Sequence, residues 1–225
     1  MCIAILMPSF KTVDKDTLKR CNTTNPDGFG YAYFDDNGKL IIKKEVDGAK
    51  IPAAINKFLD IRLKNIEKPF IAHFRIATHG RISTRCTHPF RINKSAVFCH
   101  NGILNNSFGA TRDGDMSDTM MFNRVILQQL NFNSLDKMIS GKNPVLKELL
   151  EGYIGDRNKM ILLNRAGDFQ ILNEKKGVWD KGVWYSNTTY KEIKITSFWQ
   201  GGYWDNKQGC FVTYEDNNWY NGHSY

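Results

Sequence analysis

The stretch MCIAIL, residues 1–6, places a cysteine directly behind a methionine and continues into apolar and β-branched residues. Removal of Met1 would leave Cys2 with a thiol and a free α-amine on one residue. The ordinary pKa of an α-amine is roughly 7.7 to 8.0, so the amine can serve as the base for its own thiol near neutral pH. The alternative is a small apolar cysteine that starts a strand. Residues farther along the chain decide between these two interpretations.

Six short motifs follow one another in order. They are MC at 1–2, NPDGFG at 25–30, FRIATHG at 74–80, HP at 88–89, CHNGILNN at 99–106 and SDT at 117–119. Together they resemble the class II glutamine amidotransferases, a family of N-terminal nucleophile hydrolases with a cysteine nucleophile. The resemblance covers Cys2 to about Asp118. It implies an α+β fold, the four-layer αββα sandwich, and hydrolysis of the glutamine side-chain amide through a γ-glutamyl thioester that releases glutamate and ammonia.

The resemblance also assigns residues that bind the substrate. Arg75 carries a planar fork of donors that fits a carboxylate, and it corresponds to the residue that holds the glutamine α-carboxylate. Thr78 and His79 would line the same end of the pocket. Asp118 offers the negative charge needed opposite the α-ammonium group. A structural alternative exists for Asp118, because acidic residues also favour the first turn of a helix.

The oxyanion formed during attack on the amide requires nearby hydrogen-bond donors. The Asn101 side chain supplies an amide, and Gly102 allows close approach of the backbone because it lacks a Cβ. The resemblance implies that these two residues form the oxyanion hole beside the catalytic Cys2. Asn-Gly is also a common hairpin turn, which is the structural alternative.

Two positions depart from the family pattern. Ile3 stands where many members have glycine, and Thr24 and Asn25 precede Pro26 where an arginine is familiar. Two other functions therefore stay open. One is hydrolysis of another γ-glutamyl or small amide compound, and the other is a catalytically silent binding protein on the same fold.

No cofactor is predicted. The histidines at 79, 88 and 100 have no cysteine or carboxylate at ligand spacing beside them, so the sequence predicts no metal site. The net charge of +8 is spread over segments of alternating sign, which does not favour a nucleic-acid partner. The expected small-molecule partner is glutamine, and a separate enzyme is expected to accept any ammonia. Homo-oligomerisation stays open.

Length and composition indicate a compact enzyme. The 225 residues are expected to form one domain over 1–225, with an aromatic-rich C-terminal extension at 198–225 that either adds strands or binds a partner. No apolar run approaches a membrane span, and no secretion signal opens the chain. Five cysteines without a CxxC pair favour a reducing compartment, so we expect a cytoplasmic protein.

Strands and helices are expected to alternate. Runs rich in β-branched and aromatic residues predict strands at 2–6, 30–34, 39–44, 70–75, 96–100, 159–164 and 169–173. The segment DDNGK predicts a hairpin between the second and third of these. Helices are expected at about 51–66, 118–130 and 144–154. The segment WYSNTTY at 184–190 is typical of a strand and turn, and the resemblance places it near the active site without a role for Ser186 or Asn187.

Overall fold

A computed structural model of the chain describes residues 2–78, 80–104 and 115–192, and the backbone of 202–205 and 210–213. Two compact units divide the chain, Met1–Lys191 and Glu192–Tyr225. His79, the end of the CHNGILNN motif and most of the aromatic C-terminal stretch lie outside the described residues.

The larger sheet of the first unit has six antiparallel strands in the order β3-β2-β4-β1-β10-β9. Their bounds are β1 Ile3–Met7, β2 Phe29–Phe34, β3 Leu40–Glu45, β4 Phe70–Phe74, β9 Val178–Asp180 and β10 Val183–Tyr185. All five residues of β1 are buried, which explains its unbroken apolar run. The residue that follows Met1 thus leads straight into the centre of the sheet.

The smaller sheet has four antiparallel strands in the order β5-β6-β7-β8. Their bounds are β5 Phe90–Asn93, β6 Ala96–Asn101, β7 Lys159–Asn164 and β8 Phe169–Leu172. Every residue of β6 and β7 is buried, so these two strands are covered on both faces.

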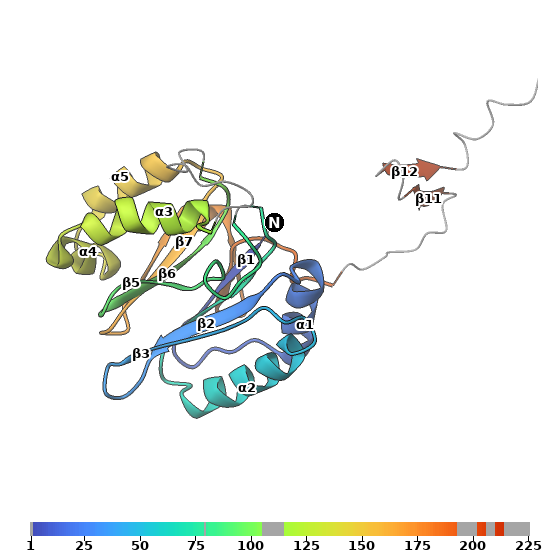
Figure 1. Cartoon of the computed structure of the whole chain (residues 1–225), viewed down its shortest axis with the longest axis horizontal. Helices are drawn as coiled ribbons and strands as arrows, with labels where there is room; N and C mark the ends of the chain where they lie inside the picture. The colour runs from blue at the N-terminus through green and yellow to red at the C-terminus, as the bar shows by residue number, and fades with distance from the viewer. Residues whose placement is uncertain (1, 79, 105–114, 193–201, 206–209, 214–225) are drawn as a thin grey trace, which may run out of the picture. The chain divides into compact units, whose positions relative to one another are not determined.

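Helices cover the outer face of each sheet (Figure 1). Helices α1 Lys15–Thr24 and α2 Ile51–Lys64 pack on the six-stranded sheet, whereas α3 Asp118–Val125, α4 Phe132–Ile139 and α5 Pro144–Ile154 pack on the four-stranded sheet. Two short 3-10 helices, η1 Leu127–Gln129 and η2 Glu174–Lys176, complete the described elements.

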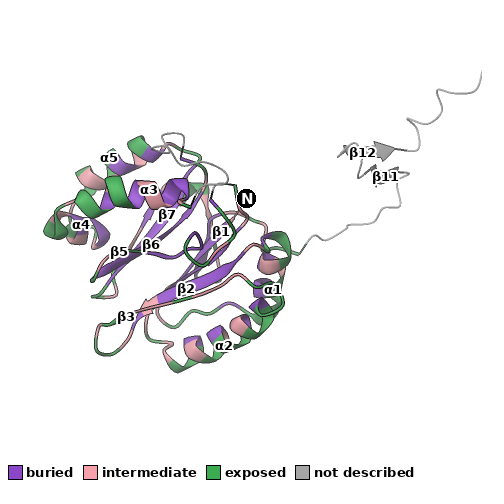
Figure 2. Ribbon diagram, viewed as in Figure 1, coloured by how far each residue is buried: buried purple, intermediate pink, exposed green. Residues whose placement is uncertain are grey.

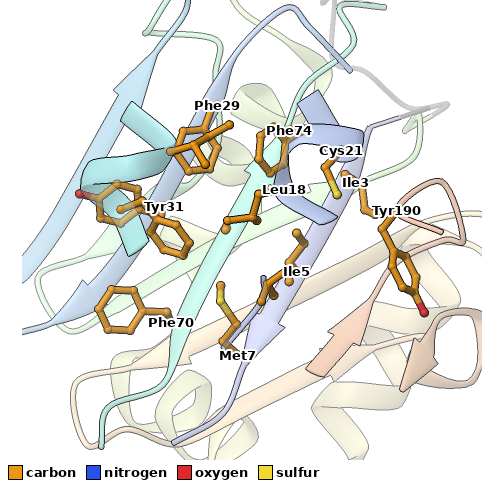
Figure 3. Packing of buried hydrophobic residues seen from close by; sticks show 14 of the residues in the cluster. Ile3, Ile5, Met7, Leu18, Cys21, Phe29, Tyr31, Phe70, Phe74 and Tyr190 are labelled. Atoms are coloured by element: carbon orange, nitrogen blue, oxygen red, sulfur yellow. The ribbon is translucent and has the colours of Figure 1, made fainter. Parts of the chain in front are cut away.

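Three apolar clusters hold these layers together. One joins α1 and α2 to the six-stranded sheet, where Phe29 and Phe74 stack with ring centroids 4.6 Å apart (Figure 3). A second joins α3, α4 and α5 to the other sheet. The third lies between the sheets and includes Leu6, Val97 and Trp184. Buried residues therefore run along the sheets and exposed ones along the outer faces of the helices (Figure 2), as the predicted four-layer αββα sandwich requires.

The expected strands all form, with ends shifted by a residue or so. The hairpin predicted from DDNGK is confirmed, because Asp35 and Lys39 are bonded across the turn and Gly38 has a φ of 67°. The helix expected at 118–130 is interrupted. It ends at Val125, the chain bends at Ile126, and the fully buried Leu127 starts the short η1. Helices α1 and α4 and strands β5 and β9 were not predicted.

In the second unit, β11 Gly202–Asp205 and β12 Cys210–Thr213 form an antiparallel pair, from Gly202 opposite Thr213 to Asp205 opposite Cys210. Part of the C-terminal stretch thus adopts strands. None of the helices within the described residues has the length and apolar character needed to cross a bilayer.

Candidate active site

Cys2 lies immediately ahead of β1 and is half-buried. Its thiol donates to the Ile76 carbonyl at 3.3 Å, and its sulfur accepts from the Ile76 N–H at 3.2 Å. The Asn187 side-chain amide donates to the Cys2 carbonyl at 2.7 Å. Cys2 is therefore fixed at both its side chain and its backbone, by residues far away in the sequence.

The surroundings of the thiol favour its protonated form. Burial raises the pKa of the Cys2 thiol above its ordinary value, and the hydrogen bond from Ile76 and the positive charge of Arg75 offset this only in part. A nucleophilic Cys2 consequently needs a base to take its proton.

Asn101 and Gly102 lie at the end of β6, on the other sheet. The Asn101 side chain is 1% exposed; its Nδ2 lies 2.8 Å from the Ser186 Oγ, and its Oδ1 is buried without a hydrogen-bond partner. Gly102 has a φ of 146°, and a Cβ at this position would collide with the Asn158 side chain. Only glycine therefore fits at position 102.

A cavity of about 370 Å³ brings several of these residues together. Cys2, Thr78, Asn101, Gly102 and Ile103 line one part of it. The segment from the end of α5 to the start of β7, residues 154–158, lines the rest and includes the exposed Asp156 and Arg157. The proposed nucleophile and the two proposed oxyanion-hole residues thus share one cavity, although they come from different sheets.

Arg75 is buried outside the lining of this cavity. Its guanidinium donates to the carbonyl of Arg81 at 2.9 Å and to that of Gly80 at 3.0 Å. Its backbone pairs with Gly28 and Asp27, so Arg75 connects the NPDGFG loop to the turn after β4. The Asp27 carboxylate reinforces this connection by accepting from the Ala77 N–H at 2.8 Å. The structure thus shows what the NPDGFG motif does: it holds the segment that carries Arg75 and Thr78.

Asp118 is the first residue of α3 and is also outside the cavity lining. Its carboxylate accepts from the Leu104 N–H at 2.9 Å and the Thr119 N–H at 2.7 Å. The capping bond is made by Ser117, whose hydroxyl accepts from the Met120 N–H. His79, the remaining predicted site residue, lies outside the described residues.

Three further residues at the site had little or no signal in the sequence. Ser186 and Asn187 belong to WYSNTTY. Ser186 is bonded to the Asn101 side chain, and Asn187 is bonded to the Cys2 carbonyl. The Asn158 Oδ1 accepts from the His100 Nε2 at 2.8 Å, and Asn158 packs against Gly102. No motif surrounds Asn158, so only the packing of α5 and β7 against β6 identifies it.

The chain is similar to known proteins in sequence and in structure. A model of the family described as class-II glutamine amidotransferases matches residues 4–154. One similar structure is glutamine phosphoribosylpyrophosphate amidotransferase from B. subtilis in complex with ADP and GMP, which is 16% identical to this chain with a TM-score of 0.49. The match covers 82% of this chain and 41% of the B. subtilis chain. A glutamine aminotransferase class-II domain protein from Silicibacter pomeroyi is 15% identical with a TM-score of 0.36, covering 73% of each chain.

No curated protein sequence matches the chain. The chain spans less than half the length of the B. subtilis enzyme. The family match, by contrast, extends over about two thirds of the residues, from β1 to the end of α5, and so takes in the Arg75 turn, the Asn101-Gly102 pair and Asp118. On that ground the chain belongs to the class II glutamine amidotransferases, enzymes whose nucleophile is an N-terminal cysteine.

Proposed function

We propose that this chain is a stand-alone glutaminase that releases ammonia and glutamate, with the ammonia passing to a separate acceptor enzyme. The observation that carries the proposal is the single cavity shared by Cys2, Asn101 and Gly102. Membership of the family supports glutamine as the nitrogen donor. The cysteine usage of the chain supports a reducing compartment such as the cytoplasm.

In the proposed reaction, removal of Met1 exposes the α-amine of Cys2. The amine takes the thiol proton, and the sulfur attacks the side-chain amide carbon of glutamine. The tetrahedral intermediate then collapses, the proton moves to the leaving nitrogen, and ammonia departs to leave a γ-glutamyl thioester. Water activated by the same amine cleaves the thioester to give glutamate and free Cys2. The raised thiol pKa supports the need for this base.

Asn101 and Gly102 are proposed to stabilise the oxyanion. The donors would be the side-chain amide of Asn101 and the backbone N–H of Gly102, each worth roughly 3 to 4 kcal/mol in comparable sites. The buried position of Asn101 strengthens its hydrogen bond to the oxyanion, because little water competes there.

Arg75 and Asp118 are proposed to hold the α-carboxylate and the α-ammonium group, with Thr78 and His79 at the same end. The Asp118 Oδ1 accepts from both the N–H and the hydroxyl of Thr119, whereas Oδ2 accepts from the Leu104 N–H and has a second lone pair for an ammonium group. The cavity itself presents a different pair of charges, Asp156 and Arg157. This pair favours a second candidate, in which the substrate is another γ-glutamyl or small amide compound.

The deciding experiment is intact mass measurement after treatment with diazo-oxo-norleucine, a glutamine-analogue electrophile, with mapping of the adduct. We expect loss of Met1 and one adduct on Cys2 that glutamine prevents. Retained Met1 with no adduct would instead favour the silent binding protein. Turnover of a panel of amides separates glutamine from the second candidate substrate class.

Substitution of the nucleophile gives the matching genetic test. Cys2→Ala should abolish glutamate release, because Cys2 is the only thiol among the described residues that line the cavity, while the thermal unfolding midpoint stays close to that of the wild type. Cys21→Ala is the matched control, since Cys21 is a buried cysteine in the cluster beneath α1 and outside the cavity. Retained turnover by a clean Cys2→Ala preparation would refute the nucleophile assignment.

A further inference from the structure

Ser186 follows β10 and is fully buried between the two sheets at the active-site end. Its backbone N–H donates to the Ala4 carbonyl at 2.9 Å, and its Oγ accepts from the Ala4 N–H at 2.9 Å. The same oxygen lies 2.8 Å from the amide nitrogen of Asn101. Ser186 therefore ties the strand that carries Cys2 to the residue proposed to face the oxyanion.

The hydrogen bonds of the Ser186 hydroxyl and the Asn101 amide are incomplete in this arrangement. A serine hydroxyl has one hydrogen and two lone pairs. In the orientation found, the Ser186 oxygen accepts from both Ala4 and Asn101, and the described residues offer no acceptor for its own hydrogen. At the same time the Asn101 Oδ1 is buried without a partner. Two polar groups at the centre of the site are thus unsatisfied.

Half a turn of the Asn101 amide gives the Ser186 hydrogen an acceptor. Exchange of the amide nitrogen and oxygen lets the Ser186 hydroxyl donate to Oδ1 while it still accepts from Ala4. The amide nitrogen then takes the place of the orphaned oxygen and presents its hydrogens there. Asn101 lines the cavity that contains Cys2, so an oxygen of a bound ligand can serve as their acceptor.

We propose that Ser186 is a positioning residue, whose hydroxyl holds the Asn101 amide with its donors toward the developing oxyanion. The inference rests on the proposed glutaminase function and adds to it the residue that orients the oxyanion hole. Because the oxyanion forms only after attack on the amide and is absent from bound glutamine, loss of the Ser186 hydroxyl lowers kcat and leaves the KM for glutamine nearly unchanged.

The test is a double-mutant cycle of glutaminase kinetics with Ser186→Ala, Asn101→Ala and the double variant. Removal of a whole oxyanion donor costs about 100-fold to 1000-fold in kcat. Ser186→Ala leaves the donor present but unguided, so we expect a smaller loss of roughly 10-fold. In the Asn101→Ala background the same change should have almost no further effect. Equal losses in both backgrounds would overturn the proposal.

Alkylation of Cys2 by iodoacetamide separates the proposed role from general damage, since this displacement forms no oxyanion. Ser186→Ala should be alkylated at the wild-type rate, and an equally slowed alkylation would show that Ser186 acts by placing Cys2 instead. Ser95→Ala is the matched control, because Ser95 is a buried serine at the opposite end of β6 from Asn101. It should leave kcat unchanged.

Two outcomes distinguish this inference from the function on which it rests. A wild-type enzyme without glutaminase activity would refute the proposed function, whereas an active wild type with an equally active Ser186→Ala variant would refute only the role of Ser186. If Ser186→Ala does not fold, Ser186→Thr keeps the hydroxyl and should retain kcat within about threefold, since one buried methyl group is the only addition. A folded threonine variant with a kcat loss of 10-fold or more would overturn the proposal.

Discussion

At the scale of single residues, the protein holds Cys2 by its neighbours instead of activating it directly. Its thiol both donates to and accepts from the backbone of Ile76, and burial raises its pKa. A nearby histidine base is not needed in such a site if the α-amine is available. These two contacts fix the sulfur, and the amine released with Met1 is proposed to supply the reactivity.

Arg75 is the residue whose assigned role and observed contacts differ most. Its guanidinium fork reaches the carbonyls of Gly80 and Arg81, which makes it a support for the turn after β4. The same fork is proposed to hold the substrate carboxylate. Both roles need the planar geometry of arginine, but only binding of the substrate carboxylate affects the affinity for substrate directly.

We therefore predict that Arg75→Lys raises the KM for glutamine by roughly 10-fold or more. A point charge cannot reproduce two parallel hydrogen bonds to a carboxylate, and charge-assisted bonds contribute about 1.5 to 3 kcal/mol each. Steady-state kinetics measures the effect. Arg157→Lys is the control, because Arg157 is an exposed arginine in the wall of the cavity. If Arg157→Lys raises KM and Arg75→Lys does not, the carboxylate binds at residues 154–158 and Arg75 is structural.

At the scale of elements, two sheets converge on the cavity from opposite sides. Strand β1 brings Cys2 and the turn after β10 brings Ser186 and Asn187, whereas the end of β6 brings Asn101 and Gly102. Buried histidines support these strands from within. His73 in β4 lies 3.0 Å from the His100 carbonyl through its Nε2, and the His73 and His88 rings are 4.2 Å apart.

Protonation of these histidines opposes folding. Burial lowers the pKa of His73 to about 3, and it lowers the pKa values of His88 and His100 below their ordinary value as well. Below about pH 6.5 the unfolded chain binds more protons at these positions than the folded protein does. Stability is therefore present above pH 6.5 and is lost as the pH falls toward 3.

We predict that the free energy of unfolding decreases between pH 6.5 and pH 5, by up to about 1.4 kcal/mol per pH unit for each buried histidine. Denaturant titrations at several pH values measure this slope. His88→Phe should reduce it, because both ring nitrogens of His88 are buried without partners and an aromatic ring retains the contact with Phe90. A slope equal to that of the wild type would show that His88 is not one of the groups responsible.

The unpredicted helices illustrate why local patterns were insufficient at this scale. In α1 only Thr17, Leu18 and Cys21 are buried, and the rest of the helix is polar, so its apolar stripe is too narrow to recognise. Helix α4 has only eight residues. Both have readable starts, since Asp14 and Asn131 cap them by accepting from the first backbone N–H groups. Packing on the sheets, not propensity, stabilises such short helices.

At the scale of the whole molecule, the proposed machinery lies entirely within the first compact unit. All described site residues precede Thr188, and the last contacts that tie the end of this unit to its body involve Tyr190. Its ring stacks on Tyr185 with centroids 3.7 Å apart, and its carbonyl accepts from Arg20. The unit Met1–Lys191 therefore contains complete apolar clusters on both sheets.

We predict that a chain ending at Lys191 folds and keeps its glutaminase kcat/KM within about twofold of the full chain. Every described residue of the apolar clusters and of the cavity lining precedes Lys191, so we expect their burial to be kept. Thermal unfolding and glutamate release of the two forms provide the comparison. A large loss of activity in a folded, shortened chain would assign the C-terminal unit a part in the site.

By itself the sequence determined the class of fold and the family. Strands β1, β6 and β7 are covered on both faces, so their long apolar runs were readable, and the turn residues of DDNGK specified the β2–β3 hairpin locally. The motifs around Cys2, Arg75 and Asn101 carry unusual residue types at fixed places, which is why the family could be recognised from them.

Only the tertiary structure decided how these residues meet. Ser186 and Asn187 approach Ala4 and Cys2 across more than 180 residues of sequence, and Asn158 reaches His100 across 58. Such pairings depend on the stacking of two sheets, because side chains from β6, β7 and the turn after β10 share one end of the sandwich. A local pattern carries no information about this register, since it is set by burial of the apolar faces between the layers.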